Sequence, residues 1–251
     1  MDIKELQKNW DEFGKTDPLW AIIVSPDKKG NKWRIDGFFR TGVEEIDTVM
    51  KYVESLSINI PRRKALDFGC GVGRLTQRMA HYFDQVYGID IAPSMIELAK
   101  KYNRYGEKCK YYLNETDDLK LFSDDSFDFI YTNITLQHME PSYSKNYIKE
   151  FLRILTPHGL LIFQLPSGKR NQLPSGKRRS IRQLIKLIIP PFFLGVYRNI
   201  NRNQPRMEMY WIKREDMVKF FEEKGGKIVD IIEDQSAGKN FVSLRYCVTK
   251  E

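Results

Sequence analysis

The residues best suited to chemistry lie where glycines occupy alternate positions after an acid, in the stretch ALDFGCGVGRL. Gly69, Gly71 and Gly73 follow Asp67, which lies near the end of a short apolar run. Glycines at alternate positions allow positive φ and let the backbone approach a ligand closely. The carboxylate of Asp67 beside such a loop disfavours a diphosphate and favours a cationic ligand. The spacing therefore predicts a binding loop.

Polar residues also follow the next apolar runs. Asp90 ends QVYGID, 17 residues after Gly73, and a carboxylate there can accept hydrogen bonds from two ribose hydroxyls. Glu115 and Thr116 follow the next run and are placed to border a purine. Open α/β sheets bind ligands at the carboxyl ends of their strands, so we expect these residues to share one pocket.

The elements that must position these residues alternate between strands and helices from residue 62 onward. This order predicts a parallel sheet with helices on both faces. The tail differs, since the runs at 227–234 and 241–249 are joined by a short loop and predict an antiparallel hairpin at the sheet edge. Residues 1–61, with a helical repeat of apolar residues at 43–56, are expected to form an N-terminal helical cap on a domain spanning 62–251.

Composition narrows the class of protein. The chain has 251 residues, 41% of them apolar, which is enough to bury a core without disulfides. Its three cysteines, Cys70, Cys109 and Cys247, form no metal or disulfide pattern, so we expect no metal and a reducing, cytoplasmic location. The N-terminus carries acids and no apolar core of a signal peptide, and no run of apolar residues is long enough to span a membrane.

The net charge of +8 comes from one segment. Residues 169–214 hold twelve basic residues and one acid, a net of +11, which leaves −3 for the rest of the chain. An insert at about 167–207 is therefore expected between the fifth and sixth strands. The motif QLPSGKR occurs twice around the start of this insert, at 164–170 and 172–178, which we interpret as a small duplication tolerated in an exposed loop.

Five ordered segments resemble the class I S-adenosylmethionine-dependent methyltransferases, most closely over residues 64–166. They are DFGCGVG, YGID, NETDDL, DDSFDFIYTN with LQHM, and FLRILTPHGLLIFQLP. The resemblance implies a Rossmann-like, doubly wound sheet of seven strands with the last strand antiparallel, and S-adenosyl-L-methionine as cofactor. One departure is PHG at 157–159, where the family usually has PGG.

Residue by residue, the resemblance implies a cofactor site on the motifs above. The three alternate glycines would pass under the cofactor, and Asp67 would contact its amino-acid end. Asp90 would bind the ribose, with Ile91 and Met95 nearby, while Glu115 and Thr116 would border the adenine. At the end of the fourth strand, Thr132 and Asn133 would face the methionine portion and the substrate.

The sequence gives weaker indications of the residues that bind or activate the methyl acceptor. His138 is the best candidate for a general base, because an imidazole suits proton abstraction near neutral pH, although a structural histidine at a helix start is the alternative. Gln164 is expected to bind a substrate hydroxyl, and Arg40 and Thr41 to form part of a lid over the cofactor. His81 and His158 are not expected to take part.

These features predict methyl transfer to oxygen or nitrogen of a small molecule, with a sugar or anionic metabolite of a glycan or secondary-metabolite pathway preferred. The alternatives are an RNA or protein methyltransferase, a non-catalytic cofactor-binding partner subunit, and an NAD-linked dehydrogenase, which Arg74 in place of a glycine disfavours. Nucleic acid is disfavoured because the basic residues form no broad face. Residues 178–198 mix apolar and basic residues, so contact with a membrane surface without a transmembrane span stays open. The oligomeric state has no signal.

Overall fold

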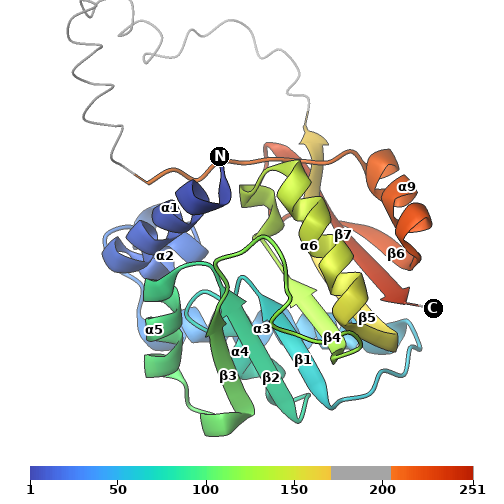
Figure 1. Ribbon diagram of the computed structural model, residues 1–251. Coiled ribbons are helices and arrows are strands. Elements are labelled where there is room, and N and C mark those ends of the chain that lie inside the picture. Colours follow the sequence, from blue (N-terminus) through green and yellow to red (C-terminus); the bar gives the residue numbers. More distant parts are fainter. Residues whose placement is uncertain (171–204, 251) are drawn as a thin grey trace, which may run out of the picture.

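The computed structural model describes residues 1–170 and 205–250, and a seven-stranded sheet runs through it (Figure 1). The strand order is β3-β2-β1-β4-β5-β7-β6. The first five strands pair in parallel, whereas β7 runs antiparallel to both neighbours. The strands are β1 (Lys64–Phe68), β2 (Gln85–Asp90), β3 (Cys109–Leu113), β4 (Phe127–Thr132), β5 (Leu155–Lys169), β6 (Gly226–Asp234) and β7 (Phe241–Lys250). The predicted fold class is confirmed, and the hairpin occupies the sheet edge with β6 outermost.

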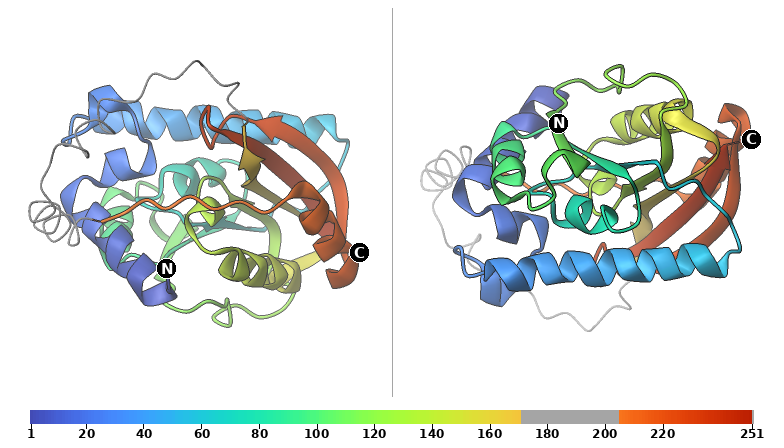
Figure 2. Two further views of the ribbon diagram at one scale, coloured as in Figure 1. Left: turned by 90° about the horizontal axis from the view of Figure 1, so that it is seen from above. Right: turned by 90° about the horizontal axis from the view of Figure 1, so that it is seen from below.

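Helices cover both faces of the sheet, as Figure 2 shows. One face packs against α3 (Ile35–Ser55), α4 (Arg74–Met79) and α5 (Pro93–Tyr102), which share a core with β1 and β4. The other face packs against α6 (Pro141–Ile154) and α9 (Arg214–Lys224). Because helices cover both sides, every residue of the central strand β4 is buried.

The N-terminal segment is helical, as expected. It contains α1 (Ile3–Thr16), α2 (Pro18–Ile22) and the 3-10 turn η1 (Pro26–Lys28) before α3 begins. A small core of buried apolar residues joins α1, α2, α3, α5 and the glycine loop; it consists of Phe13, Ala21, Phe38, Val72, Ala92 and Met95. The face of α3 that carries Ile46, Val49 and Val53 belongs to the core of the sheet itself. The remaining short turns are η2 (Gly106–Lys108) and η3 (Leu136–His138).

The first copy of the repeated motif does not lie in a loop, which corrects the predicted start of the insert at 167. Residues 164–169 continue β5 beside β7, from Gln164 opposite Arg245 to Lys169 opposite Phe241. The reason is tertiary, since the long strand β7 offers hydrogen-bonding partners that a sequence pattern does not show. The second copy at 172–178 and the segment 178–198 lie outside the described residues.

Residues 205–213 return from that segment across the end of the sheet. The amide of Tyr210 donates to the carbonyl of Gln137 at 2.7 Å, and the amide of Ile212 donates to the carbonyl of Pro166 at 3.0 Å. This strap therefore lies over the turn that carries His138. Within the described part of the chain, no helix is long and apolar enough to cross a membrane.

Candidate functional site: a pocket at the carboxyl ends of the central strands

A pocket with about 920 Å³ of empty volume, partly open to solvent, lies where β1, β2 and β4 end. The strand order reverses between β1 and β4, and open α/β sheets bind ligands at such a crevice. The walls come from the glycine loop, α1, α2 and the turn after β4; they include Leu6, Trp10, Ile22, Gly69, Gly71, Arg74, Asp90, Ile91, Met95, Asn114, Asn133, Thr135, His138 and Tyr147.

The glycine loop forms the floor of this pocket. Gly69, Gly71 and Gly73 all have positive φ, at 74°, 52° and 83°. The amide of Gly69 donates to the carbonyl of Ile89 at 2.8 Å, which ties the loop to the end of β2. A Cβ at Gly71 would lie 2.5 Å from the Cδ1 atom of Ile22, so a side chain there would fill the space beneath α2. The sequence interpretation of a close-approach loop therefore agrees with the backbone.

Gly71→Ala is expected to weaken binding of S-adenosylhomocysteine at least tenfold and to destabilise the fold by about 1–2 kcal/mol through its positive φ. Gly106→Ala is the matched control, because Gly106 has φ of 53° with no atom within 4 Å of its Cβ position. Calorimetric titration and thermal unfolding of both variants measure the two effects. Equal affinities in the two variants would show that the loop does not contact a ligand.

Asp90 stands at the pocket wall with both carboxylate oxygens oriented by backbone donors. Oδ2 accepts from the amide of Gly71 at 2.9 Å, and Oδ1 accepts from the amide of Ala92 at 2.9 Å. Burial raises the pKa of Asp90, and the backbone hydrogen bonds oppose that rise. Each oxygen keeps a second lone pair, so the carboxylate is held in place and can still accept two hydroxyl donors.

Asp67 lies beneath the loop rather than on the pocket wall. Its side chain is buried and accepts a hydrogen bond from the hydroxyl of Thr76 at 2.6 Å. Burial raises the pKa of Asp67 to about 7, and the charge of Glu45 adds to the rise, while Thr76 and Arg74 oppose it. The structure therefore puts a carboxyl group of variable charge directly under the glycines.

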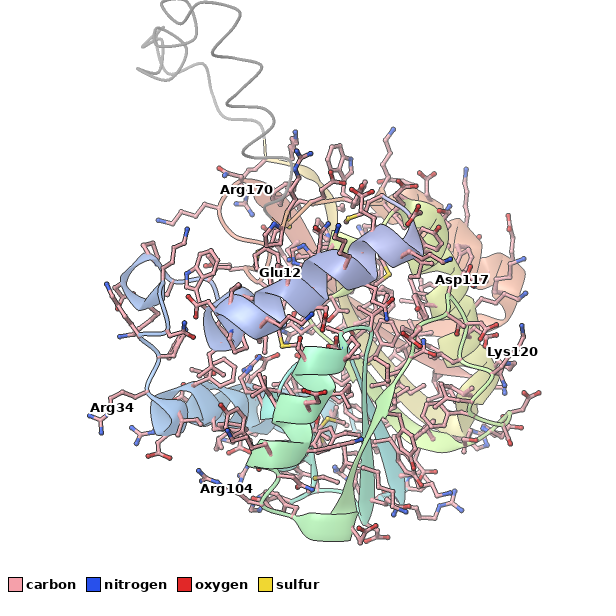
Figure 3. All side chains as sticks on the ribbon, turned by 60° about the vertical axis from the view of Figure 1, so that its left-hand side comes forward. Glu12, Arg34, Arg104, Asp117, Lys120 and Arg170 are labelled. Atoms are coloured by element: carbon pink, nitrogen blue, oxygen red, sulfur yellow. The ribbon has the colours of Figure 1, made fainter. Side chains whose placement is uncertain are left out.

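A buried ion pair borders the pocket beside Asp67. Arg74 donates through Nη2 to Oε2 of Glu45 at 2.7 Å, and its side chain is only 5% exposed. Unlike Arg74, the exposed cations Arg34, Arg104 and Lys120 point away from the molecule at its surface (Figure 3). Burial acts to raise the pKa of Glu45, but the charge and hydrogen bonds of Arg74 hold it below its usual value.

The same carboxylate organises the end of β4. Oε1 of Glu45 accepts from the hydroxyl of Tyr131 at 2.9 Å and from the side-chain amide of Asn133 at 2.7 Å. Two buried polar atoms in this cluster have no partner in the protein, namely Oδ1 of Asn133 and Nε of Arg74. Because both residues line the pocket, one free acceptor and one free donor are available to a ligand.

His138 lies at the opposite wall, in the 3-10 turn after β4. Its ring packs edge-on against Trp10 of α1, with centroids 5.1 Å apart. Nδ1 is 2.8 Å from the carbonyl oxygen of Glu208 in the strap, and Nε2 is 3.2 Å from the side-chain nitrogen of Gln137. Burial lowers the pKa of His138 to about 4, which makes the ring a weak base.

The structure brings together seven of the fifteen site residues predicted from the sequence. On the pocket wall are Gly69, Gly71, Asp90, Ile91, Met95, Asn133 and His138. The others do not line the pocket: Asp67, Gly73 and Thr132 are buried, while Arg40, Glu115 and Thr116 are exposed. Thr41 accepts from Arg74 at 3.3 Å, and Gln164 is buried among Ile134, Gln137 and Ser243. These assignments stay predictions.

Several wall residues were not predicted. Leu6 and Trp10 come from α1, and Asn114 lines the pocket in place of its neighbours Glu115 and Thr116. Leu6, Trp10 and Phe13 recur at helical spacing, which could have indicated a buried face of α1. No sequence signal indicates that this face covers the pocket, because that depends on how α1 packs.

The sequence and the fold were compared with known proteins. The family described as "Methyltransferase domain" matches residues 66–163. Phosphoethanolamine N-methyltransferase 1 of Arabidopsis thaliana is 33% identical over 128 residues, and its namesake in Zea mays is 35% identical over 129. These matches cover 50% and 51% of this chain but only 25% of each relative.

A solved structure shows the same fold over the whole chain. Magnesium protoporphyrin IX methyltransferase from Synechocystis PCC 6803, crystallised with bound SAH, superposes with a TM-score of 0.64 at 18% identity and full coverage of both chains. This likeness at 18% identity shows that the fold is the same, while the family match over residues 66–163 confirms the predicted methyltransferase and its cofactor for that domain. Residues 66–163 are therefore a methyltransferase domain.

Proposed function

We propose that this protein transfers a methyl group from S-adenosylmethionine to oxygen or nitrogen of a small molecule. The observation that carries the proposal is the carboxylate of Asp90, held by two backbone amides at the wall of a pocket whose floor is the glycine loop. The cofactor supplies an activated methyl group on a sulfonium, so the protein has mainly to orient the reactants.

The residues present fit this cofactor. Asp90 offers acceptors for two ribose hydroxyls, and the missing Cβ of Gly71 lets Ile22 lie directly against the glycine loop. The unpartnered Oδ1 of Asn133 and Nε of Arg74 suit the ammonium and carboxylate of an amino-acid end. Asp67 adds a carboxyl beneath the loop, and the apolar Ile91 and Met95 suit the adenosine.

The acceptor belongs beside Trp10, Asn133 and His138, which line the same pocket as Asp90. The relatives named above are N-methyltransferases for phosphoethanolamine, and the structural neighbour acts on magnesium protoporphyrin, which supports a small-molecule acceptor. Within that class, we favour an anionic metabolite or a sugar, because the segment 169–214 carries a net charge of +11. An RNA or protein acceptor is the second candidate, favoured by the same charge.

Asp90→Ala is expected to weaken binding of S-adenosylhomocysteine by about 1–3 kcal/mol, because charge-assisted hydrogen bonds to the ribose are lost. Isothermal titration calorimetry measures the affinity. Asp84→Ala is the control, since Asp84 is an exposed acid just before β2 begins, far along the strand from Asp90. Unchanged affinity in the Asp90 variant would remove this residue from the ribose, and absence of binding by the wild type would refute the proposed function.

A further inference from the structure

A buried chain of side-chain amides reaches His138 from the centre of the sheet. It begins at the amide of Ile134, which donates to Oε1 of Gln164 at 3.0 Å. This bond fixes the orientation of the Gln164 amide, because a backbone N–H can only donate. Nε2 of Gln164 then donates to Oε1 of Gln137 at 3.1 Å and to Oγ of Ser243 at 2.8 Å.

The orientation of Gln137 follows from that of Gln164. Its Oε1 is occupied as an acceptor, so its amide nitrogen must be the atom that lies 3.2 Å from Nε2 of His138. An amide nitrogen donates, and Nε2 of His138 must therefore carry a lone pair rather than a proton. The chain is also anchored on its far side, because Ser243 donates to Oδ1 of Asp234 at 2.6 Å.

An independent contact of the other ring nitrogen, Nδ1, indicates the same tautomer of His138. Nδ1 of His138 is 2.8 Å from the carbonyl oxygen of Glu208, and a carbonyl can only accept. Nδ1 must therefore carry the proton. Two backbone groups, the N–H of Ile134 and the C=O of Glu208, thus define one tautomer from opposite ends of the network.

We propose that Gln137 and Gln164 are positioning residues that hold His138 as a neutral ring, with its proton on Nδ1 and its Nε2 lone pair already engaged, and thereby remove it as a general base. A hydrogen on Nε2 would point at the amide nitrogen of Gln137, which is itself a donor, and would break the chain. The inference rests on the proposed function only where it concerns the reaction.

The groups around His138 agree with a neutral ring. Trp10 packs edge-on against it, and the side chain of Glu208 is engaged by the hydroxyl of Tyr210. Glu140 is bonded by the amino group of Met1, and Asp90 is bonded by backbone amides. Burial therefore dominates, and it lowers the pKa of His138.

A neutral His138 limits which acceptors can react. In methyl transfer, a lone pair of the acceptor atom forms the bond to the methyl carbon, while the carbon–sulfur bond breaks and its electron pair stays on sulfur. A carboxylate acceptor then becomes an ester with no proton to lose, whereas an amine becomes an ammonium that releases its proton to water. His138 takes no proton in either case, so a hydroxyl acceptor would have to be activated by another group.

Nitrogen NMR of the full-length protein tests the assignment directly, because the chain has only three histidines. Long-range proton–nitrogen spectra of uniformly labelled protein are recorded from pH 8 to pH 5, with His138→Gln to assign the signals. We expect one neutral tautomer with Nδ1 protonated and no titration over this range. A proton on Nε2, or a titration midpoint near 6.5, would overturn the proposal.

Variants of the amide chain separate positioning from simple packing. Gln137→Glu puts an acceptor beside Nε2, so we expect both ring nitrogens to be protonated at pH 7, whereas Gln137→Leu should leave a neutral ring that keeps its proton on Nδ1 beside the Glu208 carbonyl and has an Nε2 lone pair without a donor. Gln235→Glu is the control, since Gln235 is exposed. Unaltered His138 signals in both Gln137 variants would contradict the proposal. None of these spectra requires turnover, so a failed titration with S-adenosylhomocysteine would refute the proposed function and leave this result standing.

Discussion

Glu45→Ala is expected to lower the free energy of unfolding by about 3 kcal/mol, because it leaves the guanidinium of Arg74 buried without its counter-charge. The Arg74 side chain is 5% exposed and that of Glu45 is 19% exposed, so solvent can replace only part of the lost interaction. The substitution also removes the acceptor for Tyr131 and Asn133. Urea unfolding at neutral pH measures the loss.

Two further variants distinguish a buried charge from a lost contact. Glu44→Ala is the matched control, since Glu44 is exposed one position earlier on α3 and should change stability by less than about 0.5 kcal/mol. In the double variant Glu45→Leu with Arg74→Leu, both charges are removed, and we expect most of the stability to return. A Glu45→Ala variant as stable as Glu44→Ala would show that the pair contributes nothing.

We expect Asp67→Asn to be more stable than the wild type at pH 8. The difference in unfolding free energy, variant minus wild type, should rise by about 3–4 kcal/mol from pH 4 to pH 8. The folded-state pKa of Asp67 is raised to about 7 from 3.8, so folding favours the protonated carboxyl. The stability that this provides is fully present below pH 3.8 and is lost as the pH rises through 7, at about 1.4 kcal/mol per pKa unit. Asparagine cannot ionise and can still accept the hydrogen bond from Thr76.

Comparison with the wild type separates the pH dependence of stability caused by Asp67 from the opposite pH dependence caused by His138. The pKa of His138 is lowered to about 4, so its contribution is present above pH 6.5 and is lost as the pH falls toward 4. Both proteins contain His138, and its slope cancels in the difference between them. Unfolding free energies at pH 4, 6 and 8 provide the measurement.

Asp128→Asn serves as the contrasting control on the neighbouring strand. Burial acts to raise the pKa of Asp128, but Arg63, 2.8 Å away, and two backbone amides hold it below its usual value. Asp128 therefore stabilises the fold when it is ionised, and its replacement should cost more at pH 8 than at pH 4. The same pH dependence in both variants would contradict the assignment for Asp67.

Much of the fold was predictable because it depends on local pattern. Alternation of apolar runs and helical repeats located all seven strands, and the hairpin of β6 and β7 followed from its short loop. The extension of β5 to Lys169 was not predictable, since the partner that extends it, β7, begins 72 residues after Lys169 at Phe241. The insert, which was expected to begin at about 167, therefore begins only after β5 ends at Lys169.

Some features of the candidate site were likewise predictable from the sequence, and others were not. Gly69, Gly71 and Asp90 were found from the sequence because backbone strain and a carboxylate after a strand leave a signature in residue type and spacing. Gln164 was selected from its place near the end of the fifth strand, but the sequence does not show its hydrogen bonds with Ile134, Gln137 and Ser243. A side chain's direction is decided by what packs around it.

By itself, the sequence determined the order of the elements, the glycine loop with its acids, and so the class of chemistry. Only the tertiary structure decided which polar groups are charged and free: it buried Asp67, paired Glu45 with Arg74, and filled both nitrogens of His138. The physical reason is that a motif consists of residues close together in the chain. Burial and hydrogen-bond partners come instead from residues far apart in the chain, such as Glu208 beside His138.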